Sequence, residues 1–256
     1  MIKSAILTLF ILLFSINLQA QQKQKFVPSV LVEFYTSEGC GSCLQADEFS
    51  AQIRAIADSS QMRVFTLDYH VDLWNLSGWV DPFSDTIYTI RQQTMAVANN
   101  QRAMFTPMVF VNGTGALPSG AKSEVGKLIE KFTRNPAENF LLMSASWNPN
   151  TKILDFEYEA KGETDSLDIY FVLTQKNASS VPNGGENKDK KLHHKNVAIK
   201  MVNSTNVKAT GSIGMVMPVP NVDFDKYIVY GFLQHKRTKQ ITATQVLEFN
   251  QMQPTE

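Results

Sequence analysis

The sequence contains only two cysteines, Cys40 and Cys43, although it runs to 256 residues. A second cysteine pair, which a disulfide-stabilised extracellular scaffold would need, is absent. A bridge between cysteines this close together closes a short loop and constrains the unfolded chain little. Stabilisation of the fold is therefore a poor explanation for the pair, and two chemical explanations are open, redox exchange and metal binding.

Charge of one sign and long apolar runs are also scarce. The chain has 24 Lys and Arg against 24 Asp and Glu, so its formal net charge is zero. This balance excludes the strongly basic character that binds nucleic acid or anionic membranes, and we expect neither partner. After residue 20, no stretch is long and apolar enough for a membrane span, which takes about 20 residues. The sequence also lacks a phosphate loop, a dinucleotide fingerprint and a metalloprotease motif.

The N-terminus has the pattern of a secretory signal peptide. Lys3 supplies a positive start, residues 5–16 form a short apolar run, and Ala20 precedes the polar residues 21–25. An uncleaved anchor is the alternative. We expect removal of residues 1–20 and export to the periplasm or the medium, with no stable membrane insertion afterwards.

Hydrophobic periodicity predicts two domains. In the first half, it predicts strands over residues 29–36, 62–70 and 106–111, a short strand around 116–117, and helices over 42–58, 83–99 and 123–132. The order β-α-β-α-β-β-α indicates an α/β domain over residues 27–135. The second half has short strand patterns separated by turn signals, which predict an all-β, sandwich-like domain over residues 139–250. The polar residues 177–191 are expected to form a long exposed loop.

The Cys40-Gly41-Ser42-Cys43 motif follows a predicted strand and opens a predicted helix, a context typical of a thioredoxin-like redox motif. Unpaired N–H groups at a helix N-terminus lower the pKa of a thiol, and the thiolate is the nucleophile. We therefore expect Cys40 to attack and Cys43, one turn further on, to resolve the mixed disulfide. This chemistry needs no dissociable cofactor, and its partners are protein thiols and disulfides.

Glu33 is an acid inside the apolar run that precedes the motif. If it is buried, its pKa is raised and it is a candidate proton acceptor for Cys43. The other interpretation is that it points to solvent.

His70 and Asp72 follow the second predicted strand, at the kind of strand end that lines the binding crevice of an open α/β sheet. They either stand near the thiols or cap the strand and brace the segment that follows. Trp74 and Trp79 in that segment either form a hydrophobic substrate groove or belong to its core. The adjacent His193 and His194 project in different directions in a strand and do not make a metal site by themselves.

Several blocks of the sequence carry a resemblance to known proteins. They are FYTSEGCGSC (34–43), HVDLW (70–74), GWVDPFS (78–84), TPMVFVNG (106–113), GEN (185–187) and LHHKNV (192–197). The first resembles the active site of thioredoxin, and together they resemble a family of secreted, thioredoxin-like bacterial proteins, domain of unknown function 1223. The resemblance implies a thioredoxin-like fold, a bacterial exported protein, and Thr106-Pro107 as a substrate-docking segment with a cis-proline that faces the cysteines. It also implies that the loop around Asn187 is structured and docks on the first domain.

The sequence thus predicts an exported thiol–disulfide oxidoreductase that uses Cys40, Cys43 and Pro107, with Glu33 as the candidate proton acceptor. Two alternatives stay open. One is a Cu(I)- or Zn(II)-handling protein with Cys40, Cys43 and His70 as ligands. The other is a binding module with a non-catalytic thioredoxin-like fold, in which the second half carries the function.

Overall fold

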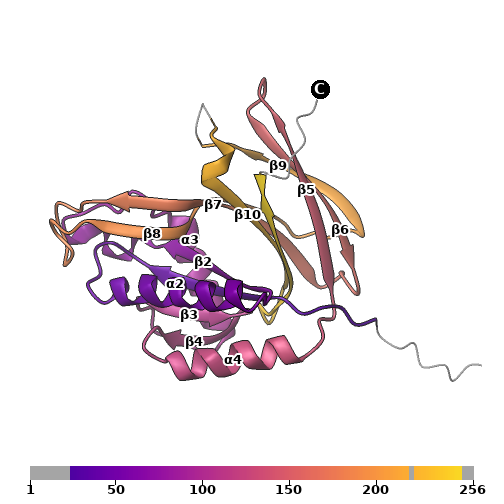
Figure 1. The fold of residues 1–256 in the computed structure, drawn as a ribbon, viewed down its shortest axis with the longest axis horizontal. Helices are drawn as coiled ribbons and strands as arrows, with labels where there is room; N and C mark the ends of the chain where they lie inside the picture. The colour runs from indigo at the N-terminus through magenta and orange to yellow at the C-terminus, as the bar shows by residue number, and fades with distance from the viewer. Residues whose placement is uncertain (1–23, 219–221, 250–256) are drawn as a thin grey trace, which may run out of the picture.

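Eight strands form one mixed sheet that runs through both halves of the chain (Figure 1). The computed structural model describes residues 24–218 and 222–249, so the signal peptide expected over residues 1–20 lies outside the described residues. In chain order the elements are β1 (Val30–Thr36), α2 (Cys43–Ser59), β2 (Val64–His70), η1 (Asp72–Ser77), α3 (Thr86–Ala98), β3 (Met108–Val111), β4 (Thr114–Pro118), α4 (Lys122–Arg134), β5 (Phe140–Asn148), β6 (Ile153–Lys161), β7 (Leu167–Ser180), β8 (Leu192–Ser204), β9 (Thr210–Val216), η2 (Phe224–Lys226), β10 (Tyr227–His235) and β11 (Ile241–Glu248). The element order expected for the first half is confirmed, and the chain is a mixed α/β protein with a large sheet and few helices.

The large sheet has the strand order β11-β10-β7-β8-β2-β1-β3-β4. β1 pairs parallel with β2 and antiparallel with β3. β8 runs parallel to β2 and joins it at the pair Asp68 and Val197, which covers an edge of β2 that would otherwise be open. The strands β7, β8, β10 and β11 therefore continue the first sheet across the boundary that we expect between residues 135 and 139.

The alternation of side chains along β1 decides which helix each of them meets. Val32 and Phe34 pack in one apolar cluster with residues of α2 and α4. Leu31 and Tyr35 pack in another with residues of α3. The helices α2 and α4 therefore cover one face of the sheet and α3 covers the other (Figure 1). Burial on both faces explains why β1 is apolar almost throughout.

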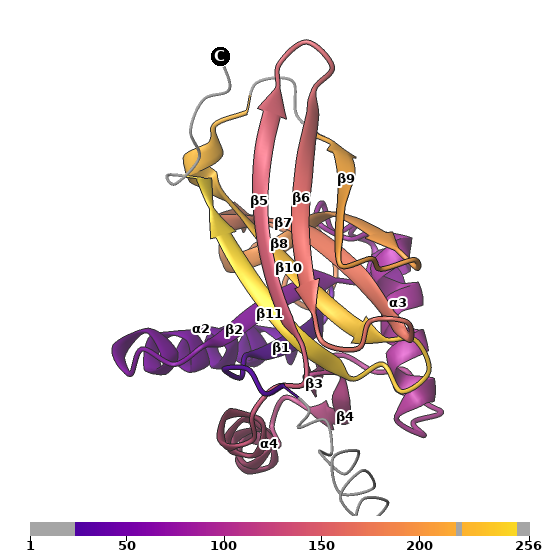
Figure 2. The same cartoon turned by 90° about the vertical axis from the view of Figure 1, so that its right-hand side faces the viewer.

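A second sheet, with the order β5-β6-β9, packs against β7, β10 and β11 (Figure 2). Alternation along β6 turns Leu154, Phe156 and Tyr158 toward this interface. Phe156 stacks on Phe171 of β7, with ring centroids 4.6 Å apart. The second half thus contains two layered sheets, one of which it shares with the first half.

The polar residues 177–191 differ from the long exposed loop expected. β7 continues to Ser180 and β8 begins at Leu192, because the two strands stay paired beyond the apolar part of their sequences. Only residues 181–191, called the strap below, connect them. Asn187 in the strap is fully buried, so this segment packs against the rest of the molecule.

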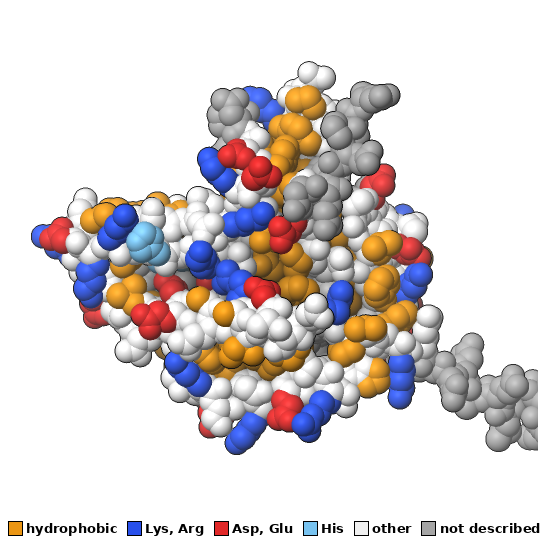
Figure 3. All heavy atoms as spheres, in the orientation of Figure 1, with side chains coloured by type: hydrophobic (Ala, Val, Ile, Leu, Met, Phe, Trp, Pro, Cys, Tyr) orange, Lys and Arg blue, Asp and Glu red, His pale blue; other side chains and the backbone are white. Residues whose placement is uncertain are grey.

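The surface combines both signs of charge. On the face shown in Figure 3, acidic and basic side chains lie interspersed among hydrophobic ones. None of the helices in the described ranges has the length and apolar character that a membrane crossing requires.

Candidate functional site

The two cysteines lie where β1 gives way to α2. β1 is buried along its whole length, and the chain turns through residues 37–42 before α2 begins at Cys43. The backbone N–H of Cys40 donates to the carbonyl of Ser37 at 3.2 Å, and that of Cys43 donates to the carbonyl of Cys40 at 3.2 Å. Cys40 and Cys43 form a disulfide, with their Cα atoms 5.4 Å apart. Cys40 is 1% exposed and Cys43 is 2% exposed, so the disulfide is covered.

The segment that precedes β3 faces Cys40. The Sγ of Cys40 lies 3.8 Å from the carbonyl oxygen of Thr106, and the Thr106–Pro107 peptide bond is cis. The indole Nε1 of Trp74 donates to Oγ1 of Thr106 at 2.7 Å. The structure therefore brings Cys40, Cys43, Thr106, Pro107 and Trp74 together at one place.

Glu33 is not brought to this place. Its side chain is fully buried, and its Oε1 accepts a hydrogen bond from Nε of Arg91 at 2.9 Å. Burial alone would lower the pKa of Arg91, but the charge of Glu33 raises it above its usual range. Arg91 belongs to α3, whereas Cys43 opens α2 on the other face of the sheet. The sheet thus separates the Glu33 carboxylate from Cys43.

His70 ends β2 and reaches the cysteine loop through an aspartate. Its Nδ1 lies 2.7 Å from Oδ2 of Asp81, and the same oxygen accepts the backbone N–H of Glu38 at 2.8 Å. Burial alone would raise the pKa of Asp81, but the charge and hydrogen bond of His70 lower it. Asp72 accepts hydrogen bonds from the hydroxyls of two threonines of α3, which lower its pKa. Both residues therefore contact the segment between β2 and α3, and His70 is also connected to the cysteine loop through Asp81.

A buried histidine lies between two carboxylates beside the cysteine loop, a position that the sequence pattern does not indicate. Nε2 of His194 lies 3.0 Å from Oε1 of Glu38, and its Nδ1 lies 2.8 Å from Oδ2 of Asp47 on α2. Burial alone would lower the pKa of His194, but the hydrogen bonds with Asp47 and Glu38 raise it to about 10. At neutral pH the ring is therefore protonated and donates to both carboxylates. Alternation along β8 places Leu192, His194 and Asn196 on the buried face.

These groups form one continuous network. The rings of His70 and His194 meet edge to face with centroids 4.7 Å apart, and Phe83 packs against both. The indole Nε1 of Trp79 donates to Oε2 of Glu38 at 2.7 Å, so this tryptophan contacts the site through a carboxylate. The network contacts the cysteine loop through Glu38, which lies two residues before Cys40 in the sequence.

The strap docks on the same loop. Nδ2 of Asn187 donates to the carbonyl oxygens of Glu38 and Cys40, each at 2.9 Å. The expectation that this segment is structured and docks on the first half is therefore confirmed.

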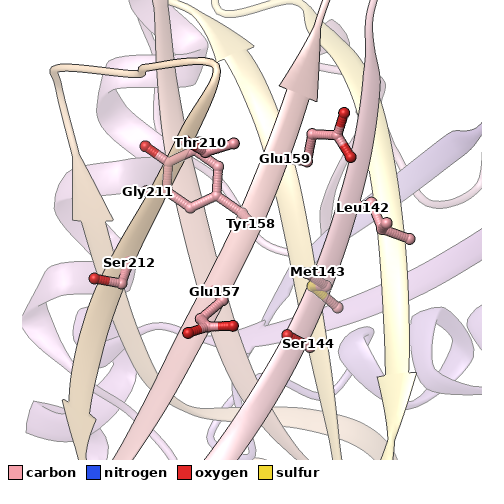
Figure 4. Close-up of a pocket in the computed structure, with 9 residues that line it drawn as sticks. All are labelled: Leu142, Met143, Ser144, Glu157, Tyr158, Glu159, Thr210, Gly211 and Ser212. Carbon is pink, nitrogen blue, oxygen red and sulfur yellow. The ribbon is translucent and has the colours of Figure 1, made fainter.

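A metal ion needs several His, Cys, Asp or Glu side chains that converge on one point. Within residues 24–218 and 222–249, no group of three or more His, Cys, Asp and Glu side chains is arranged to hold one. A separate surface pocket of about 650 Å³ lies on the sheet β5-β6-β9 (Figure 4). Its lining includes Leu142, Tyr158 and Ser212, and none of its lining residues belongs to the elements around the cysteines.

Comparison with protein families identifies the chain. Residues 31–233 match the family described as protein of unknown function (DUF1223), a range that contains both cysteines, Thr106–Pro107 and the strap. The chain belongs to this family. Membership carries no activity with it, because the description of the DUF1223 family states none. A comparison with curated proteins gives no match.

Two solved structures share the fold of this DUF1223 member. One is the X-ray crystal structure of protein AGR_C_4864 from Agrobacterium tumefaciens, with 19% identity and a TM-score of 0.65 over 91% of this chain and 99% of that chain. The other is HBP35 of Porphyromonas gingivalis, with 16% identity and a TM-score of 0.68 over 91% of this chain and 79% of that chain. At these identities the likeness concerns the fold alone.

Proposed function

We propose that this protein is an exported thiol–disulfide oxidoreductase whose first half has a thioredoxin-like arrangement. Cys40 is the attacking thiol and Cys43 the resolving thiol. Thr106, Pro107 and Trp74 receive the partner's chain beside them. The observation that carries the proposal is the position of the disulfide at the start of α2, with Sγ of Cys40 3.8 Å from the carbonyl oxygen of Thr106 on the neighbouring segment.

The reaction is thiol–disulfide exchange. In the reduced protein, the thiolate of Cys40 attacks one sulfur of a partner disulfide, and the partner's other sulfur leaves and takes a proton. Cys43 then attacks the sulfur of Cys40, which restores the Cys40–Cys43 bond and releases the second partner thiol. The partner gains two electrons and two protons. The cysteine pair supplies both electrons and the proton of Cys43, and solvent supplies the second proton. No dissociable cofactor enters this scheme.

The roles of the two cysteines are tested by single substitutions in an insulin-reduction assay driven by dithiothreitol. We expect Cys40→Ser to abolish acceleration over dithiothreitol alone. We expect reduced Cys43→Ser, mixed with insulin after removal of dithiothreitol, to accumulate a covalent adduct visible by non-reducing electrophoresis, because the mixed disulfide at Cys40 cannot be resolved. Circular dichroism checks that both variants fold. A wild-type rate in Cys40→Ser would refute the proposal and leave the scaffold as a binding module.

Export is proposed from the N-terminal sequence pattern and is tested separately. Expression of the full chain in a bacterium should yield a product whose mass corresponds to cleavage after Ala20 and which fractionates outside the cytoplasm. An intact N-terminus on a cytoplasmic product would contradict this part of the proposal without touching the thiol chemistry.

A further inference from the structure

The strap has a defined shape of its own. The backbone N–H of Asp189 donates to the carbonyl of Pro182 at 2.8 Å, and that of Lys190 donates to the carbonyl of Asn187 at 3.1 Å. Nζ of Lys190 also donates to Oδ1 of Asn187 at 3.0 Å. These internal bonds orient the amide of Asn187 so that its nitrogen points into the molecule.

Two neighbouring residues of the strap bind the backbone of the cysteine loop. Asn187 spans the loop by donating to the carbonyl oxygens of Glu38 and Cys40. Glu186 donates its backbone N–H to the carbonyl of Gly39 at 3.2 Å, and its Oε2 accepts the N–H of Gly41 at 2.6 Å. The strap therefore holds the residues on both sides of Cys40.

The strap also packs against the loop without a gap. Gly39 lies between Trp74 and the strap, because a Cβ added to Gly39 would lie 2.8 Å from Cβ of Trp74. A Cβ added to Gly185 would lie 3.0 Å from Cα of Gly39, and Gly185 has φ +73°, which favours glycine. In this closed arrangement Cys40 is only 1% exposed. A protein thiol has to approach the disulfide sulfur directly, so the loop that the strap holds must loosen before exchange occurs.

The charge of Glu186 links this cover to the redox state of the cysteines. In the oxidised protein its carboxylate accepts the N–H of Gly41, the residue that follows Cys40, and the disulfide carries no charge. After reduction, the Cys40 thiolate lies next to Gly41 and needs the same N–H groups at the start of α2. A carboxylate bound to the N–H of Gly41 and a thiolate on the preceding residue repel each other, and the cover that brings them together is weakened.

We propose that the strap is a redox-linked cover of the cysteine site, held closed over the disulfide by Glu186 and Asn187 and released when reduction places a thiolate on Cys40. The inference rests on the proposed function. In the reducing step, a dithiol gives two electrons to the pair and becomes a disulfide. The Cys40–Cys43 bond breaks, Cys43 takes one proton, Cys40 remains a thiolate, and the second proton goes to solvent. Glu186 and Asn187 are positioning residues, since they act on the cysteines through the backbone and through charge.

Amide hydrogen exchange on the purified protein, oxidised and reduced with dithiothreitol, tests the proposal. We expect amides of residues 181–191 to exchange about tenfold faster after reduction. Repulsion between the Glu186 carboxylate and the Cys40 thiolate lowers the free energy needed for local opening of the strap. Peptides from the turn between β5 and β6 serve as an internal reference and should not change. Reversible loss and return of the disulfide, measured on the same samples by mass spectrometry, establishes that the pair exchanges.

Three variants separate charge from bond loss. The double variant Cys40→Ala/Cys43→Ala has neither bond nor thiolate, and its strap should exchange as slowly as in the oxidised protein. Glu186→Gln removes the charge at an exposed position that should tolerate the change. In this variant the difference in strap exchange rate between the oxidised and the reduced protein should be smaller. Asn187→Ala should exchange fast in both states.

The outcomes are distinct. A reversible disulfide with unchanged strap exchange would overturn the cover and leave the proposed function intact. Fast exchange in the double alanine variant would overturn the role of the thiolate charge. If the pair forms no reversible disulfide, the proposed function fails and the redox-linked cover fails with it.

Discussion

Glu38 and His194 form a buried pair, with Oε1 and Nε2 3.0 Å apart, although one belongs to the cysteine loop and the other to β8. Both side chains are almost fully buried, and His194 makes its second hydrogen bond with Asp47 of α2. A protonated ring thus bridges the loop before Cys40 and the helix after Cys43. This contact gives the second half of the chain a direct part in the geometry of the cysteine site.

Replacement of His194 by Gln should destabilise the protein. The variant leaves the buried Glu38 and the partly buried Asp47 without their positive partner, and removal of one member of a buried ion pair costs about 3–5 kcal/mol. Urea unfolding at pH 6 measures the loss. His193→Gln is the matched control, because His193 is exposed on the other face of β8 and its change should leave stability within about 0.5 kcal/mol.

The same variant has a defined pH dependence. The pKa of His194 is raised from 6.5 to about 10 in the folded state, so its stabilising contribution is complete below pH 6.5 and is lost as the pH rises through 10. The difference between wild type and His194→Gln should therefore shrink between these values. A difference that grows with pH would contradict a protonated ring.

Ionisation of the buried Asp68 carboxyl group should destabilise the folded protein. Burial is the main cause that raises its pKa from 3.8 to about 7, and the neighbouring charge of Asp47 adds to it, while Ser50 donates to the carboxyl group at 2.9 Å. The folded state therefore loses stability as the pH rises from 3.8 to 7 and the unfolded chain ionises first. Asp68→Asn keeps an acceptor for Ser50. Its free energy of unfolding should exceed that of the wild type by about 2–4 kcal/mol at pH 8 and by less at pH 4. Urea unfolding at the two pH values measures this difference, and an equal gain at both would contradict the raised pKa.

The sequence predicts local features of this protein well, and its long-range features poorly. The apolar run of β1, the spacing of Phe49 and Ile53 on α2, and the position of Cys40 at a helix start follow from periodicity and neighbouring residues. The pairing of β2 with β8 at Asp68 and Val197 joins strands that are distant in the sequence, and no local pattern specifies it. His194 precedes the strand that the apolar pattern predicts, and its partners Glu38 and Asp47 come from other elements, so neither its burial nor its role could be derived from the sequence.

Glu33 shows the same limit at a single residue. Its place between Val32 and Phe34 determines that it points to the opposite face from both, but not which helix covers that face. The structure places Arg91 there. Glu33→Gln should lower stability by about 3 kcal/mol, because Arg91 loses its buried counter-charge, and should leave the rate of thiol–disulfide exchange per folded molecule unchanged. Thermal melting and the insulin assay measure the two effects; a slower exchange with unchanged melting would restore the role of proton acceptor for Cys43.

The fit of Gly185 against Gly39 leads to a prediction about access to the disulfide. Gly185→Ala adds a Cβ that would lie 3.0 Å from Cα of Gly39, at a backbone φ of +73°. A left-handed conformation costs a residue other than glycine about 1–2 kcal/mol, so the closed strap loses stability relative to the open one. Reduction of the disulfide by dithiothreitol, followed by stopped thiol labelling, should become about tenfold faster, since 1.4 kcal/mol corresponds to a factor of ten. Gly115→Ala is the matched control, because Gly115 in β4 also has a positive φ of +80° and its added Cβ would also lie 3.0 Å from its nearest neighbour, Cδ1 of Leu128, which is not part of the strap. Equal reduction rates in wild type and Gly185→Ala, with Gly185→Ala folded, would show that the strap does not limit access to Cys40.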